Sequence, residues 1–191
     1  IEFSDWSSDV CSSDLYFSGT GTTKKVTAAI ADELTEIKIS QDETAAGENP
    51  GSIKAGIKPW QRAADIDFTP PAARREIYRF TPDDLVVFGV PVIAGRVPNV
   101  LLKFLDTLQG GGALAVPVVL YGNRNFDDAL IELRNILQDR GFYAIGAAAF
   151  IGEHSFSRIL AAGRPDSSDM ELSRDFARKL AGKIRRLGAA G

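Results

Sequence analysis

The sequence predicts an α/β domain in which helices cover both faces of a parallel β-sheet. Strand-like and helix-like segments alternate along most of the chain, as in doubly wound folds. Two of the strand-like segments, 85–90 and 114–121, are continuous apolar runs, which is typical of strands buried on both faces. Hydrophobic residues make up 45% of the 191 residues, which is enough to build the core of one domain.

The composition excludes several classes of function. The chain has 22 Lys and Arg against 25 Asp and Glu, so it lacks the basic footprint of a nucleic-acid-binding protein. No apolar run approaches the ~20 residues that a membrane-spanning helix needs. One cysteine and one histidine exclude a disulfide framework, a Cys/His zinc site and an iron–sulfur cluster held by this chain alone. We therefore expect a cytoplasmic protein without nucleic-acid or membrane partners.

Residues 1–15 are expected to be a leader that is not native to the domain. They include four acidic residues and no basic one, and they lack the basic start and apolar stretch of a signal peptide. From Asp5 to Leu15 the segment DWSSDVCSSDL resembles a translated sequencing adapter. Without residues 1–15 the chain keeps 22 basic and 21 acidic residues and loses its cysteine. The native domain is thus expected to begin near Tyr16 and to be close to neutral.

The first half of the chain predicts one helix and one strand before a long irregular region. A turn rich in hydroxyl groups and glycine occupies 18–23. Apolar residues at helical spacing predict a helix over 23–34, and the alternation in 36–40 predicts a short strand. The glycines and prolines of 41–75 predict an irregular crossover.

The second half alternates more regularly. Its strands are predicted from apolar runs, and its helices from apolar residues that recur on one face. Gly141 stands where a glycine commonly ends a helix. In chain order the predicted elements are a strand at 85–90, a helix at 99–108, a strand at 114–121, a helix at 126–140, a strand at 142–151 and a helix at 170–187.

In a sheet of this kind, ligands bind beyond the C-terminal ends of the strands, which makes the loops 18–23, 91–98 and 121–126 the candidate site. The first loop, Ser-Gly-Thr-Gly-Thr-Thr, supplies backbone N–H groups, hydroxyls and a helix N-terminus, which together suit a phosphate dianion. It is not a Walker A loop, because no glycine precedes the lysines at the required spacing. It is not a dinucleotide fingerprint either, because Lys24 stands where the third glycine is needed.

This turn resembles the phosphate loop of the flavodoxin family, which has the form T/S-x-T-G-x-T. Two further segments, FGVPVIAGRVPN at 88–99 and LYGNRNFDDAL at 120–130, resemble the flavin-flanking loops of flavodoxin-like domains that are fused to ferredoxins. The resemblance extends from Tyr16 to about Ile184. It implies a five-stranded parallel sheet of order 2-1-3-4-5 in a three-layer α/β/α arrangement. It also implies an FMN-binding domain over 16–187, followed by a tail at 188–191.

The resemblance assigns two sets of residues to FMN. The phosphate is expected to bind Ser18, Gly19, Thr20, Gly21, Thr22 and Thr23. The isoalloxazine ring is expected between two loops, at Pro91, Val92, Ile93, Ala94, Gly95, Arg96, Tyr121, Gly122, Asn123, Arg124 and Phe126. Thr22 stands where the family mostly has asparagine, and Ile93 where it often has an aromatic residue. Gly95 offers the backbone freedom for a rearrangement linked to the redox state.

Several residues in or next to these loops have two interpretations. Tyr121 either stacks on the flavin or ends the core of its strand. Arg96 and Arg124 either stabilise a reduced, anionic flavin or are solvated charges. His154 either contacts the flavin or a partner, or packs within its loop. Lys24 and Lys25 either assist the phosphate or belong to an exposed helix face.

The expected function is that of an FMN-binding electron-transfer domain whose partner is a ferredoxin-type or other redox protein, separate or fused. Two alternatives stay open. One is an FMN-dependent oxidoreductase that acts on a quinone or a porphyrinogen, and the other is a flavin-free binding module of the same shape. In strand order 2-1-3-4-5 the first strand is central, and the leader residues 10–15 take its place. Burial of Ser12, Ser13 and Asp14 there is expected to destabilise the fold.

Overall fold

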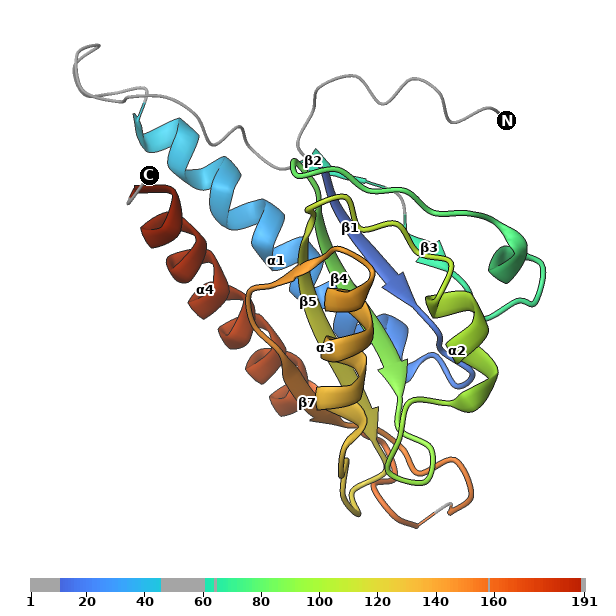
Figure 1. Cartoon of the computed structure of the whole chain (residues 1–191). Coiled ribbons are helices and arrows are strands. Elements are labelled where there is room, and N and C mark those ends of the chain that lie inside the picture. Colours follow the sequence, from blue (N-terminus) through green and yellow to red (C-terminus); the bar gives the residue numbers. More distant parts are fainter. Residues whose placement is uncertain (1–10, 46–60, 64, 158, 190–191) are drawn as a thin grey trace.

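The computed structural model describes residues 11–45, 61–63, 65–157 and 159–189 (Figure 1). The helices are α1 (Thr22–Ala45), α2 (Asn99–Leu105), α3 (Ala129–Asp139) and α4 (Ser167–Ala189), with a 3-10 turn at Ala73–Arg75. The strands are β1 (Cys11–Tyr16), β2 (Gln61–Arg62), β3 (Ile66–Asp67), β4 (Leu85–Pro91), β5 (Leu114–Tyr121), β6 (Tyr143–Ala144) and β7 (Ala148–Ile151). Among the described residues, no helix is long and apolar enough to cross a membrane.

The strands form one parallel sheet whose order is β2-β1-β4-β5-β6. β3 also pairs with β1, and β7 also pairs with β5, so each edge consists of two short strands in line. If each interrupted edge is taken as one strand, the order along the chain is 2-1-3-4-5. The predicted doubly wound sheet and its strand order are therefore confirmed.

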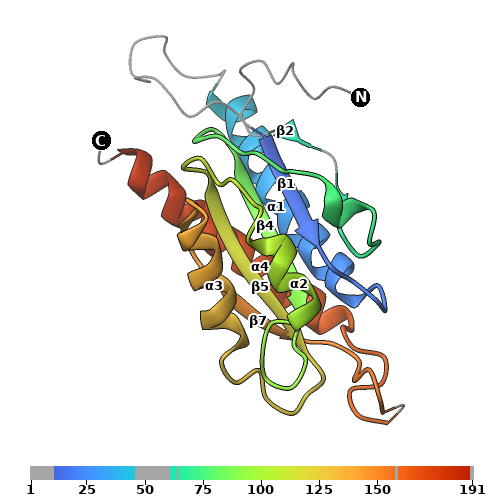
Figure 2. The same ribbon diagram turned by 45° about the vertical axis from the view of Figure 1, so that its right-hand side comes forward.

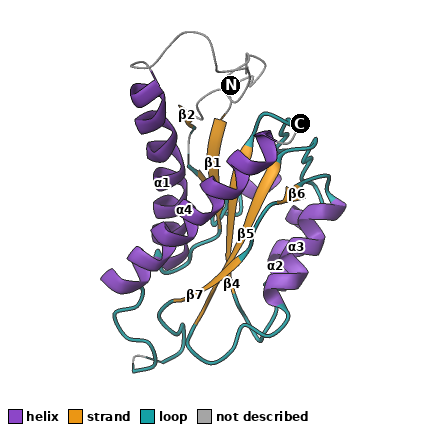
Figure 3. Ribbon diagram, turned by 90° about the vertical axis from the view of Figure 1, so that its left-hand side faces the viewer, coloured by secondary structure: helices purple, strands orange, loops and turns teal. Residues whose placement is uncertain are grey.

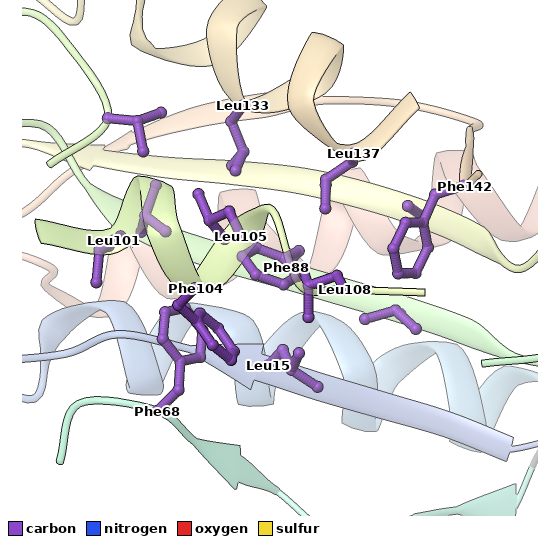
Figure 4. Packing of buried hydrophobic residues seen from close by; sticks show 14 of the residues in the cluster. Leu15, Phe68, Phe88, Leu101, Phe104, Leu105, Leu108, Leu133, Leu137 and Phe142 are labelled. Atoms are coloured by element: carbon purple, nitrogen blue, oxygen red, sulfur yellow. The ribbon is translucent and has the colours of Figure 1, made fainter. Parts of the chain in front are cut away.

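Two helices cover each face of the sheet (Figures 2 and 3). α1 and α4 lie together on one face, where Val26 and Ile30 of α1 pack with Val87 of β4 and Leu180 of α4. On the other face, residues of α2 and α3 pack against Phe88 of β4 (Figure 4). Successive residues of β4 thus point to opposite faces, and both are buried. This explains why the predicted strand is apolar throughout.

Aromatic packing holds the short edge strand β3 to the body of the domain. Phe68, which follows β3 directly, is fully buried, and its ring centroid lies 4.8 Å from that of Phe104 on α2 and 5.4 Å from that of Phe88 on β4. The three rings lie together in the core (Figure 4). The two-residue strand β3 is therefore stabilised mainly by the burial of the Phe68 side chain that follows it.

Two predictions about the first half of the chain are wrong. The predicted strand at 36–40 belongs to α1, which continues to Ala45. Its place in the sheet is taken by β2 and β3, which lie in the region 41–75 that predicts an irregular crossover. The alternation in 36–40 is too short to distinguish a strand from a helix that has already begun, and extending a formed helix is easier than starting a new element.

The predicted strand at 142–151 is interrupted, because β6 and β7 are separated at residues 145–147. A Cβ atom at Gly146 would collide with the Leu180 side chain, so α4 packs directly against the chain where the strand breaks. The other predicted helices and strands are present with boundaries shifted by a few residues, and β5 has the predicted bounds. Gly141 ends α3 with a φ of +87°, as predicted.

All residues of the central strand β1 except Tyr16 belong to the predicted leader. Its neighbours are β4 on one side and β2 with β3 on the other. Ser13 and Asp14 are buried in it, as expected, while the side chain of Ser12 lies outside what the structure describes. Residues 1–10 of the predicted leader, 46–60 of the predicted crossover and 190–191 of the predicted tail also lie outside the described residues.

Candidate functional site at the strand ends

The three predicted loops begin side by side at the C-terminal ends of β1, β4 and β5. The amide of Phe17 donates to the carbonyl oxygen of Gly89 at 3.0 Å, and the amide of Val92 donates to that of Leu120 at 2.7 Å. A fourth loop, 152–166, starts at the same edge, because the amide of Gly152 donates to the carbonyl of Tyr121 at 3.0 Å. Parallel strands bring these segments together although up to 135 residues separate them in the chain.

The first loop presents a row of unpaired backbone donors. At its start, the amide of Ser18 donates to Oγ1 of Thr69 at 2.8 Å. At its end, the amide of Lys24 donates to Oγ of Ser18 at 3.2 Å, and that of Lys25 to the carbonyl of Gly21 at 3.2 Å. Between these points, the five amides of residues 19–23 have no hydrogen-bond partner among the described residues. They lie at the positive end of the long helix α1.

The space beside these donors is open. A Cβ atom at Gly19 or at Gly21 would meet no other atom within 4 Å. The hydroxyl groups of Thr20 and Thr22 hydrogen-bond to each other with their oxygens 3.1 Å apart, so one hydroxyl proton is free beside the amides and the other becomes free when this bond is exchanged for one to an anion. Gly21 has a φ of +82°, which glycine adopts without strain. The loop is therefore a cradle of N–H and O–H groups with room for an anion.

A glycine in β4 sets the position of this cradle. A Cβ atom at Gly89 would collide with the side chains of Thr23 and Thr27, both of which are buried. The first turns of α1 therefore lie directly against the β4 backbone. Because the donors of the first loop are attached to these turns, their place depends on this close approach.

The second loop forms a tight turn. The amide of Ile93 donates to the carbonyl of Arg96 at 3.0 Å, and that of Arg96 to the carbonyl of Ile93 at 3.1 Å. The two central residues, Ala94 and Gly95, have φ values of 51° and 75°. Such a pair forms a type I′ turn, in which a non-glycine residue such as Ala94 is strained. The side chain of Ile93 is 51% exposed at this turn.

Arg96 is tied to α3 rather than free. Its Nε and Nη2 atoms donate to the two carboxylate oxygens of Glu132 at 2.9 and 2.7 Å. The amide of Val97 donates to the same carboxylate at 2.8 Å. The hydrogen bonds from Arg96 lower the pKa of Glu132 despite its partial burial. In this geometry the Arg96 charge is paired with Glu132 while its side chain stays 57% exposed, so the ion pair ties the second loop to α3.

The third loop packs against the second and within itself. A Cβ atom at Gly95 would lie 2.9 Å from Cβ of Asp127, so the two loops touch. The rings of Tyr121 and Phe126 pack with centroids 5.5 Å apart, and Phe126 also contacts the core. Asn123, with a φ of 59°, is exposed in the turn between them. Arg124 is exposed as well, and no ion pair of Arg124 occurs among the described residues.

The fourth loop completes the site; the sequence singled out only its His154, as either a flavin or partner contact or a packing residue, and assigned none of its other residues to the cofactor. A Cβ atom at Gly152 would lie 3.4 Å from Oγ1 of Thr22, in the first loop. A Cβ atom at Gly122, in the third loop, would lie 2.7 Å from Cδ2 of His154. The loop thus reaches both the phosphate cradle and the ring loops. Its position after the last strand of a parallel sheet is the signal that could have revealed this.

Two other features lie apart from the cradle. The ammonium group of Lys24 lies over the Tyr16 ring, 5.6 Å from its centroid, so its side chain is directed toward β1. A hollow of about 500 Å³ lies between α2 and α3 and is lined by Arg96, Glu132, Asp106 and Asp139 among others. Its acidic lining does not suit a phosphate group, whereas the first loop contains no acidic residue.

The residues at the strand ends fit the binding requirements of FMN. A phosphate monoester needs several donors, and the loop 18–23 supplies them without an acidic residue of its own. The carboxylate of Asp67, which lies near the start of the loop, accepts a hydrogen bond from the amide of Thr69 at 2.8 Å. The segments that the resemblance assigns to the ring also lie next to each other at this edge, because the turn at Gly95 touches Asp127, directly after the third loop. The arrangement therefore brings together all the segments that the sequence assigns to the cofactor.

Comparison with known proteins supports the fold. No protein-family model and no curated protein sequence matches the chain. Among solved structures, a flavodoxin from the domain Archaea superposes with a TM-score of 0.54 at 12% identity, over 91% of this chain and 98% of that one. Flavodoxin 2 from Bacillus cereus superposes with a TM-score of 0.54 at 16% identity, over 91% and 99%. The apo form of the NADH:FMN oxidoreductase EMOB superposes with a TM-score of 0.53 at 15% identity, over 90% and 88%. The chain has the flavodoxin-like fold.

Proposed function

We propose that this chain binds FMN at the C-terminal edge of its sheet and acts as an electron-transfer flavoprotein. The observation that carries the proposal is the row of five unpaired amides at 19–23, next to open space and two threonine hydroxyls. Backbone donors at a helix N-terminus bind phosphate without a basic side chain. The similarity of the fold to those of flavodoxins supports the same assignment.

The residues of the chain take separate roles in this proposal. Residues 18–23 hold the phosphate, and the segments 91–96 and 121–126 hold the ring. The Arg96–Glu132 pair keeps the second loop against α3, and the packing of Tyr121 on Phe126 keeps the third loop in shape. When bound, FMN supplies one- and two-electron redox chemistry that side chains lack. We propose a ferredoxin-type or other redox protein as the partner, on the resemblance of the two ring loops to domains fused to ferredoxins.

Titration of the purified chain with FMN and with riboflavin, followed by flavin fluorescence, tests the proposal. FMN is expected to bind more tightly than riboflavin, because only FMN has a phosphate. Replacing Thr20 and Thr22 together with alanine should weaken FMN binding by on the order of tenfold per hydroxyl that donates to the dianion, and should leave riboflavin binding unchanged. Thr107→Ala, at an exposed position two residues after the end of α2, is the matched control. A chain that binds neither flavin would contradict the proposal and would favour a flavin-free binding module.

A specific observation also favours the second candidate, an FMN-dependent oxidoreductase that acts on a quinone or porphyrinogen. The side chains of Phe156 and Ile159, in the loop 152–166, are 92% and 88% exposed at the edge where the flavin is proposed to bind. Apolar side chains at that place suit a flat apolar substrate, and one solved structure of similar fold is an NADH:FMN oxidoreductase. Steady-state reduction of a quinone by NADH or NADPH in the presence of FMN distinguishes this enzyme from a carrier that only exchanges electrons with a protein partner.

A further inference from the structure

The first loop is held at its start by a residue that lies 51 positions further along the chain. The amide of Ser18 donates to Oγ1 of Thr69 at 2.8 Å. The Oγ atom of Ser18 in turn accepts a hydrogen bond from the amide of Lys24, in the first turn of α1, at 3.2 Å. Ser18 is therefore fixed on two sides, to the segment that follows β3 and to the helix that carries the loop.

Thr69 lies in a turn whose backbone is held by several other groups. Its amide donates to Oδ1 of Asp67 at 2.8 Å, and its carbonyl oxygen accepts from Nη1 of Arg74 at 2.7 Å. The same Nη1 atom donates to the carbonyl oxygen of Phe68 at 3.0 Å, and the guanidinium carbon of Arg74 lies 5.7 Å from the centroid of the Phe17 ring. Phe68 itself is fully buried in the core. The backbone before and after the Thr69 hydroxyl is thus fixed, which makes its oxygen a stationary acceptor.

The stretch of the first loop after its start has few contacts of its own. Among the residues that the structure describes, nothing lies within 4 Å of a Cβ atom placed at Gly19 or at Gly21. Within the same described part of the chain, the side chains of residues 19–22 form one hydrogen bond, between the hydroxyl groups of Thr20 and Thr22. Glycine has more backbone freedom than other residues, so the geometry of this stretch depends on where its two ends are fixed. The far end is held by α1, and the near end is held by Thr69.

We infer that Thr69 is a positioning residue for the phosphate of FMN. With its hydroxyl as acceptor, the free protein already holds the start of the loop, and the phosphate binds at a small ordering cost. Without this acceptor the Ser18 amide turns to water, the flexible stretch after it gains conformations, and the phosphate must order that stretch when it binds. The hydrogen bond itself is present in the free and in the bound protein and cancels, but the ordering cost does not, because the loss of freedom occurs only on binding. The inference rests on the proposed function, since it needs a phosphate at residues 19–23.

Titration of Thr69→Val with FMN and with riboflavin tests this role, because valine has the shape of threonine but cannot accept a hydrogen bond. The dissociation constant of FMN is expected to rise about tenfold, which corresponds to the ordering of about one backbone residue. That of riboflavin, which has no phosphate, should change by less than about twofold. Thr69→Ser keeps the hydroxyl and should bind FMN as the wild type does. Thr107→Val, at an exposed position two residues after the end of α2, is the matched control and should change neither constant.

Amide hydrogen exchange of the full chain, followed by NMR, measures the restraint directly. In the free protein the Ser18 amide should exchange about fivefold faster in Thr69→Val than in the wild type, because one neutral hydrogen bond is lost. Thr69→Ser should keep the slower exchange of the wild type. The amides of residues 19–23, which have no hydrogen-bond partner among the described residues, should become protected in all three chains when FMN binds.

The outcomes separate the inference from the function on which it rests. If the wild type prefers FMN to riboflavin and Thr69→Val binds FMN as tightly or more tightly, Thr69 does not position the loop and the inference is overturned. The same conclusion follows if Thr69→Val weakens the binding of both flavins equally, because such a change does not act through the phosphate. If the wild type binds the two flavins with equal strength, or binds neither, the proposed phosphate site fails and the inference fails with it.

Discussion

β1 and β4 are neighbouring parallel strands in the middle of one sheet, but they bury very different side chains. In β4 the six residues 85–90 are all buried and, apart from Gly89, large and apolar. In β1, which pairs Asp14 with Val87 of β4, Ser13 is 6% exposed and Asp14 is completely buried. The place of these strands in the sheet, rather than the polarity of their residues, therefore decided which side chains are buried. The buried polar side chains of a central strand therefore need hydrogen-bond or ion-pair partners, which apolar side chains do not need.

Asp14 finds those partners on two other elements. Nη1 of Arg62, in β2, lies 3.0 Å from Oδ1 of Asp14, and the Thr27 hydroxyl in α1 donates to Oδ2 at 3.3 Å. Arg62 also pairs with Asp32 at 3.0 Å and with Asp65 at 2.6 Å. The Arg62 N–H is not aligned on Oδ1 of Asp14, so this contact is an ion pair without a hydrogen bond. Burial raises the pKa of Asp14 to about 6, although Arg62 opposes this change.

The largest effect is expected when Arg62, the cation that contacts Asp14 among the described residues, is replaced. Arg62→Met should lower the free energy of unfolding by about 3 kcal/mol at pH 8, because a buried carboxylate then loses its counter-charge. Urea denaturation at pH 8 measures this loss. Arg79→Met, which removes an exposed arginine bonded to Gln109, is the control and should change stability by less than about 0.5 kcal/mol. Equal effects of the two substitutions would show that Asp14 does not need Arg62.

The second prediction concerns a variant in which β1 buries apolar side chains, as β4 does. Replacing Ser13 and Asp14 together with valine should raise the free energy of unfolding by about 2–3 kcal/mol, since apolar residues in place of a buried ion pair often stabilise. Arg62 keeps Asp32 and Asp65 as partners in this variant. Adding Arg62→Met to the double variant should then cost much less than it does in the wild type. A double-valine chain with the wild-type melting temperature would contradict the view that β1 is a weak central strand.

The third prediction concerns pH. Because the pKa of Asp14 is raised to about 6 in the folded chain, the folded state holds this proton more tightly than the unfolded state does. Its contribution to stability is therefore complete below the unfolded pKa and is lost as the pH rises through about 6. Stability should increase by on the order of 1–2 kcal/mol between pH 7.5 and pH 5. Asp14→Asn, which has nearly the same shape and does not titrate, should lose most of this increase.

The smallest effect is expected at the one small residue of β4. Gly89→Ala should lower the free energy of unfolding by about 1 kcal/mol, because the added methyl group meets Thr23 and Thr27 of α1. Gly19→Ala, whose added atom meets nothing, is the matched control for stability. Because Gly89 positions the first turn of α1, Gly89→Ala should also weaken FMN binding. An unchanged stability would mean that α1 shifts freely against β4.

Local patterns predicted the parts of the fold whose signal lies within a few residues. The apolar runs at 85–90 and 114–121 indicated strands buried on both faces, and these are β4 and β5. The turn Ser18–Thr23 indicated an anion site because glycines, hydroxyls and a helix start follow one another directly. Once parallel strands were expected, the meeting of the loops 18–23, 91–98 and 121–126 at one edge followed from topology.

Other features depended on residues that are distant in the chain, and only the tertiary structure decided them. α1 extends to Ala45 across the short alternation at 36–40 that predicted a strand. β2 and β3 both pair with β1, and Phe68, next to β3, packs against Phe104 in the core. The links of Arg96 to Glu132 and of Gly122 to His154 join residues 36 and 32 positions apart. Likewise, nothing in the order of residues indicates that Arg62 would face Asp14. Side-chain partners across a sheet are chosen by the packing of whole elements, so a sequence predicts which segments form the site but not which charges and rings finally meet there.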